Sequence, residues 1–156
     1  MTIDVSTARS TIQKTLHDIG LWSQSAEDII LGIGAQESNY QYVQQIGGGP
    51  ALGYWQMEPA THDDIWKNYL HYRAPLAGKI QTLLQGSPVS ASAMVNNLPY
   101  AIGMARVKLL RAPEPFPLAG DIDGYADYWK KWWNTNGGAG TIDEFLNNWQ
   151  KYIANA

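Results

Sequence analysis

Glu37 combines the side chain and the position that a general acid requires. The residues before it, 25–36, carry Ala26, Ile29, Ile30 and Ile33 at the spacing of one helical face. Because Glu37 lies four residues beyond Ile33, its carboxyl group belongs to the same apolar face. Loss of hydration at the edge of such a face favours the neutral carboxyl group and raises its pKa. Glu37 can therefore hold a proton for donation near neutral pH.

A second polar segment begins after three glycines at positions 47–49. It reads Pro50-Ala51-Leu52-Gly53-Tyr54-Trp55-Gln56-Met57-Glu58-Pro59-Ala60-Thr61. Taken alone, Glu37 fits better with a surface residue that ends a helix, and this second segment reverses that preference. The chain resembles the lytic transglycosylases and goose-type lysozymes at two sets of residues in the same order. The first set is Glu37-Ser38 with Tyr40, and the second is Ala51, Gly53, Gln56, Pro59 and Thr61. The sequence departs from that family's pattern at Pro50, at Tyr54-Trp55 and at Glu58.

The resemblance implies cleavage of peptidoglycan at the MurNAc–GlcNAc β-1,4 bond, with Glu37 as general acid and base. It also implies one lysozyme-like domain over residues 1–156, in which Gln56 contacts a sugar amide and Ser38 orients the carboxyl or N-acetyl group. In the family a Tyr-Asn-Ala-Gly segment places a tyrosine hydroxyl on the catalytic Glu, and Trp133 occupies that aromatic position. An indole can only donate, so Tyr54 is a second candidate for the hydroxyl. The predicted substrate-binding residues are Ser38, Tyr54, Gln56, Glu58, Trp133, Asn134 and Thr135.

The outcome of the reaction depends on a second carboxylate. If a second acid activates water across the sugar ring, the bond is hydrolysed, as in a muramidase. Without one, the resemblance implies that the sugar's 6-hydroxyl attacks C1 and leaves a 1,6-anhydro end. The candidate second acids are Glu58, Asp63, Asp64, Asp121 and Asp123. Glu58 lies nearest Gln56 but can also be a charge at a helix start, so the sequence favours the transglycosylase.

The composition limits the possible partners. A net charge of −3 gives no attraction to nucleic acid or anionic membranes. The chain has no cysteine, and its three histidines lack metal-ligand spacing, so we expect no metal site and no cofactor. Seven Trp and nine Tyr against two Phe favour a groove that stacks on sugars, although Trp also fills helical cores.

Helical periodicity extends over nearly the whole chain. Seven segments fit helices: residues 5–19, 25–36, 59–70, 80–84, 98–110, 122–133 and 141–153. The segment 98–110 is apolar nearly all round, which predicts a buried helix surrounded by the six or so others. Ser25 with Asp28 resembles a capping box, and Gly32 and Gly34 suggest the close approach of another helix. Residues 134–140 read as a loop, and a small β-hairpin would fit between positions 41 and 57.

The N-terminal residues lack the basic and apolar regions of a signal peptide. Together with the resemblance, this predicts a phage lysin, either an endolysin or a virion-associated enzyme. It would be made in the cytoplasm, act on the host cell wall, and be a monomer or a component of a virion. Three alternatives remain open: a toxin-like or injected effector in place of a phage enzyme, a catalytically weak, wall-binding structural component of the virion, and a chitinase of the same fold.

Overall fold

The computed structural model describes residues 2–135 and 137–155 and is mainly α-helical, as the sequence predicts. Positions 1, 136 and 156, which belong to the predicted domain and, for 136, to the predicted loop 134–140, lie outside the described residues. The α-helices are α1 (Val5–Asp18), α2 (Gln24–Glu37), α3 (Pro59–Asn68), α4 (Ala74–Thr82), α5 (Ala93–Asn96), α6 (Leu98–Leu110), α7 (Ile122–Trp129) and α8 (Ile142–Asn148). A 3-10 turn, η1 (Leu70–Tyr72), follows α3, and two π-helical segments, η2 (Lys130–Asn134) and η3 (Trp149–Ala154), extend α7 and α8.

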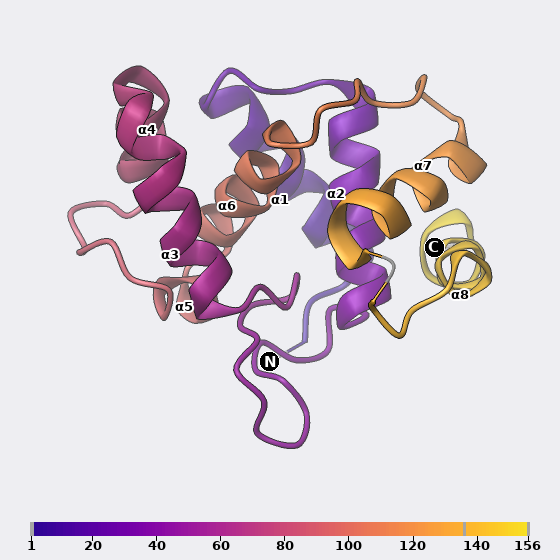
Figure 1. Ribbon diagram of the computed structural model, residues 1–156. Coiled ribbons are helices and arrows are strands. Elements are labelled where there is room, and N and C mark those ends of the chain that lie inside the picture. Colours follow the sequence, from indigo (N-terminus) through magenta and orange to yellow (C-terminus); the bar gives the residue numbers. More distant parts are fainter. Residues whose placement is uncertain (1, 136, 156) are drawn as a thin grey trace.

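Two helices form the centre of the molecule. In Figure 1, α2 stands between α1 and α6 on one side and α7 and α8 on the other. Helix α6 is buried as predicted, but α2 is buried as completely, since every residue from 25 to 35 is buried. The expected single buried helix is therefore a pair, and the predicted amphipathic helix before Glu37 has no solvent-exposed face over these positions.

A polar network allows α2 to be buried on its charged side. The Arg9 guanidinium of α1 donates to Glu27 at 2.6 Å and to Asp28 at 3.0 Å. The Trp22 indole donates to the other oxygen of Glu27 at 2.8 Å, and the Tyr125 hydroxyl donates to Asp28 at 2.9 Å. Buried carboxylates are tolerated when they are paired and hydrogen-bonded, and both conditions are met here.

All seven predicted helical segments are present, with different boundaries. Helix α4 begins at Ala74 rather than near position 80, because Pro75 suits its first turn. The short helix α5 was not predicted.

The cap of α2 also differs from the prediction. Ser23 accepts the Ala26 amide at 3.1 Å, whereas Ser25, the predicted cap, donates to the Pro117 carbonyl at 2.6 Å. Over the described ranges, no helix is long and apolar enough to cross a membrane.

The predicted hairpin between positions 41 and 57 is reduced to two isolated antiparallel bridges. Gln44 pairs with Leu52, and Leu52 pairs with Met57. The part of the chain that the structure describes contains no strand. The segment is instead fixed to α2 by an aromatic anchor, because the Trp55 indole donates to the Ile30 carbonyl at 2.8 Å.

The two glycines of α2 permit close contacts of different kinds. At Gly32, a Cβ would lie 2.7 Å from the Phe145 ring and 3.2 Å from the Trp149 ring, so this position admits the α8–η3 segment as predicted. At Gly34 the neighbour is not a helix. The ring of Tyr40 lies against it, and the Tyr40 hydroxyl donates to the Leu31 carbonyl at 2.7 Å. The expected helix contact is therefore wrong for Gly34.

Replacing Gly32 by Ala should destabilise the fold by about 1–3 kcal/mol, since two buried rings would have to move. The matched control is Gly78→Ala in α4, where a Cβ meets no atom within 4 Å. There the better helix propensity of Ala should raise stability by about 1 kcal/mol. Urea unfolding measures both changes, and equal effects of the two substitutions would contradict the close packing at Gly32.

Candidate active site

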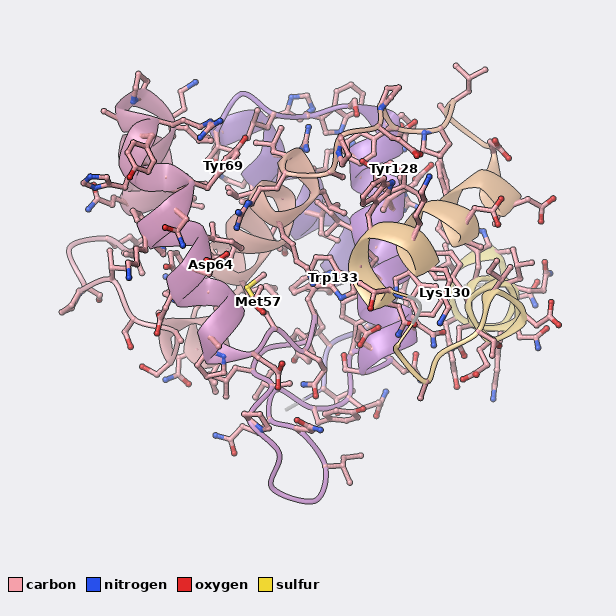
Figure 2. All side chains as sticks on the ribbon, viewed as in Figure 1. Met57, Asp64, Tyr69, Tyr128, Lys130 and Trp133 are labelled. Carbon is pink, nitrogen blue, oxygen red and sulfur yellow. The ribbon has the colours of Figure 1, made fainter. Side chains whose placement is uncertain are left out.

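A cleft of about 640 Å³ opens beside the C-terminal end of α2. This volume is typical of ligand-binding sites. The lining comes from α2, the loop after it, the start of α3, α6 and η2, so segments far apart in the sequence meet here. Its residues are Glu37, Tyr42, Gln45, Ile46, Ala51, Gln56, Met57, Glu58, Thr61, Lys108, Trp133, Asn134 and Gly138. In Figure 2, Met57 and Trp133 lie in this region, between α3 and the α7–η2 segment.

Glu37 is the last residue of α2 and is half-buried in the wall of the cleft. Burial raises the pKa of its carboxyl group above the ordinary value, and it outweighs two opposing influences, a hydrogen bond from Trp129 and the charge of Lys108. The Tyr42 hydroxyl donates to the Glu37 carbonyl at 2.9 Å and so ties the following loop to the helix end. The raised pKa that the apolar stripe predicts is therefore present.

The side-chain donor to Glu37 is Trp129, which the sequence analysis did not assign to the site. Its indole Nε1 donates to Oε2 of Glu37 at 3.2 Å, and its ring stacks on Phe145. Trp129 lies one helical turn before Trp133, the residue at the family's aromatic position. The sequence thus predicted an aromatic contact to Glu37 from the helix at residues 122–133, but the residue that donates is Trp129, four positions before Trp133.

Lys108 is the second unpredicted member of the site. It projects from the buried helix α6 into the cleft lining, and its ammonium lies 3.9 Å from the centroid of the Trp133 ring. Burial lowers the pKa of Lys108 to about 8, although the carboxylates of Glu37 and Glu58 act in the opposite direction. The sequence signal that could have identified it is a charged residue in a largely apolar helix, but Arg106 in the same helix gives the same signal.

Gln56 and Glu58 both line the cleft, as predicted. Gln56 has a left-handed backbone, with φ of 51°, and its side-chain Nε2 donates to the Gly53 carbonyl at 2.9 Å. Such strained backbone is found at functional sites more often than elsewhere. Glu58 precedes Pro59 at the start of α3, but its side chain forms no capping hydrogen bond. Its carboxylate is exposed at the N-terminal end of α3, so the alternative of a charge at a helix start remains open beside a role in the cleft.

Three predicted substrate-binding residues lie outside the cleft lining. Ser38 is buried, donates to the Gly34 carbonyl at 3.2 Å and accepts the Tyr40 amide at 3.1 Å, so its hydroxyl is used by the backbone. Tyr54 is buried among Tyr40 and Trp55 and borders a separate apolar cavity, so it does not replace the family's tyrosine hydroxyl. Thr135 is exposed just beyond Asn134. Their positions do not support contact with a ligand in this cleft.

Trp133 and Asn134 form the wall opposite α3. Only one tryptophan, Trp133, contributes to the cleft lining, and Trp55, Trp129 and Trp149 are buried in the core. Tyr42 and Trp133 are thus the aromatic side chains in the lining of the described cleft, whereas the three buried tryptophans follow the alternative of a helical core. The loop beyond Asn134 is held by Lys130, whose ammonium donates to the Asn134 side chain at 2.6 Å and to the carbonyls of Gly138 and Gly140 at 3.1 and 2.7 Å. Figure 2 labels Lys130 on the far side of α7 from Met57.

The candidate second carboxylates differ in position. Of the five, Glu58 alone lines the cleft. Asp63 contacts the buried ring of His62 at 2.8 Å, Asp64 pairs with Arg111 at 2.7 Å, and Asp121 caps α7. Asp123 is an exposed residue in the first turn of that helix. Within residues 2–135 and 137–155, no group of three or more acidic or histidine side chains is arranged to hold a metal ion.

Searches with protein-family models, curated protein sequences and solved structures gave no match to this chain.

Proposed function

We propose that the protein is a peptidoglycan lytic transglycosylase with a lysozyme-like fold, in which Glu37 is the general acid and base. One observation carries the proposal: a half-buried carboxyl group with a raised pKa stands in the wall of a ligand-sized cleft that also contains Gln56. The order of residues between Glu37 and Thr61, which resembles this enzyme family, adds independent support.

The chemistry requires one proton to be given and then recovered. Protonated Glu37 donates to the oxygen of the leaving sugar while the C1–O bond breaks, and positive charge develops at the ring. The 6-hydroxyl of the sugar that carries C1 then bonds to C1, and the Glu37 carboxylate accepts the proton of that hydroxyl. The strand ends in a 1,6-anhydro sugar, no water is consumed, and Glu37 is returned to its acid form.

Both supporting groups suit this cycle. The Trp129 indole steadies the ionised carboxylate between the two steps, while burial favours the protonated form before the first. The Gln56 amide is held by Gly53 through its nitrogen, which directs this side chain along the lining of the cleft. The amide can both donate and accept, as recognition of a sugar N-acetyl group requires.

Hydrolysis is the second candidate function, and the position of Glu58 favours it. Glu58 is the candidate second acid that reaches the cleft, and it could activate a water there. A muramidase and a transglycosylase would share Glu37 and differ in the use of Glu58. We place either enzyme among phage lysins that act on the host wall, as the sequence leads us to expect.

The test is digestion of purified peptidoglycan sacculi followed by mass spectrometry of the soluble fragments. Fragments that are lighter by one water, with anhydro ends, are expected for the transglycosylase. Reducing ends would assign the muramidase instead. Protein that pellets with sacculi but releases no fragment would contradict both and favour a wall-binding structural component.

A further inference from the structure

Among the described residues that line the cleft, Lys108 is the one cationic side chain, and no described residue accepts a hydrogen bond from its ammonium. Its neighbour on α6, Arg106, donates to the Leu21 carbonyl at 3.0 Å and lies over the Phe116 ring. Lys108 instead contacts only an aromatic face: among residues 2–135 and 137–155, no hydrogen bond or ion pair to its Nζ is formed. Its influence on Glu37 and Glu58 is a longer-range electrostatic interaction.

The ammonium of Lys108 is half-buried in the cleft, where burial disfavours its charge and the Trp133 ring provides a cation–π contact. Lysine has three N–H donors, and these can bind oxygen acceptors. Because the pKa of Lys108 is about 8, the group is largely protonated at pH 7. An oxygen acceptor from a bound ligand would complete it.

We propose that Lys108, supported by Trp133, forms a subsite for the carboxylate or acyl oxygen of a muramyl sugar's lactyl ether. This rests on the proposed function and specifies its substrate class. The two sugars of peptidoglycan differ in that one carries a lactyl ether at O3, whereas a chitin chain has none. A buried donor discriminates strongly against a ligand that lacks the matching acceptor. The subsite therefore selects peptidoglycan over chitin.

The charges around the cleft agree with this assignment. Its charged lining groups are Glu37, Glu58 and Lys108, so a ligand carboxylate would be repelled if Lys108 were absent. A carboxylate paired with Lys108 would also weaken the interaction by which that lysine lowers the pKa of Glu37. Binding of the muramyl sugar would thus favour the protonated Glu37 that the first chemical step needs.

The experiment measures binding rather than turnover. In a Glu37→Gln background, calorimetry compares a peptide-free tetrasaccharide of alternating GlcNAc and MurNAc with chitotetraose. We expect the muramyl ligand to bind tighter by about tenfold to a hundredfold, the range of a charge-assisted hydrogen bond. Adding Lys108→Met should abolish this preference and leave the affinity for chitotetraose unchanged. Lys108→Gln, which retains a donor, should lose only part of it and serves if the Met variant is unstable.

The control and the contrary outcomes are distinct. Lys67→Met changes the same charge at an exposed position of α3 and should keep the full preference. Equal binding of the two tetrasaccharides, binding of neither, or a preference that survives Lys108→Met would each overturn the subsite. If the parental protein cleaves sacculi but the muramyl tetrasaccharide binds no tighter than chitotetraose, the proposed function stands and the subsite is wrong. If the muramyl ligand binds tighter but the parental protein does not cleave sacculi, the subsite stands and the proposed enzymatic activity is wrong.

Discussion

Glu37→Gln is expected to reduce the release of soluble fragments from sacculi by about 10²–10⁴-fold, the usual contribution of a general acid. Gln has nearly the same shape but carries no titratable proton, so the fold and the binding of glycan should persist. The measurement is the initial rate of fragment release at equal protein concentration, together with the unfolding midpoint. A variant that retains the parental rate would eliminate Glu37 as the acid and, with it, the proposed function.

Two further substitutions calibrate this result. Asp123→Asn removes one negative charge at an exposed position of α7 and should leave the rate unchanged. Glu58→Gln separates the two possible reactions, because the transglycosylase does not require a second carboxylate. A loss as large as that of Glu37→Gln would assign Glu58 as the base of a hydrolase.

The same carboxyl group should govern the pH dependence of the reaction. The first step needs protonated Glu37, so kcat/KM should fall as the pH rises through the pKa of this group in the free enzyme. Because burial raises that pKa, the fall should begin above the ordinary value of 4.5. A profile whose decline lies at or below that value would contradict the raised pKa of Glu37.

Arg9→Met is expected to lower the free energy of unfolding by about 3 kcal/mol, near the lower end of the range for breaking a buried ion pair. The substitution leaves the carboxylates of Glu27 and Asp28 buried without their cation. Their side chains are 2% and 11% exposed, whereas Arg9 is 36% exposed, which is why the upper end of the range is not expected. Urea unfolding at neutral pH measures the loss.

The comparison for Arg9 is Lys14→Met, which removes an exposed ion pair within the same helix. Lys14 lies 2.6 Å from Asp18 and is 77% exposed, so its loss should change stability by no more than about 0.5 kcal/mol. Similar effects of the two substitutions would indicate that the Arg9 network contributes no more than a surface pair.

Most of the helices were predictable from the sequence because their apolar residues repeat at helical spacing, whereas the four-residue helix α5 is too short to show such a repeat. Helix α2 shows the limit of that argument. Its charged residues Glu27 and Asp28 imply an exposed side, but Arg9 from α1 and Tyr125 from α7 come from distant segments and cover it. Periodicity within one helix contains no information on such partners. The weak pairing around Leu52 has the same origin, since β-propensity alone does not supply a partner strand.

The site was predictable where its residues belong to local motifs. Glu37, Gln56, Glu58, Trp133 and Asn134 line one cleft, although their roles there remain proposals. Ser38 and Tyr54 do not, because residues adjacent in sequence to a site residue can point into the core. Lys108 escaped prediction because its position depends on how the unrelated helix α6 crosses behind the cleft.

Helix α2 separates the Arg9 ion pairs near its start from Glu37 at its last residue by about 15 Å. Substitutions at sites this far apart usually have additive effects. Protein engineers can therefore seek heat tolerance around one end of this helix and vary the proposed acid at the other, treating the two changes as separable in a combined library.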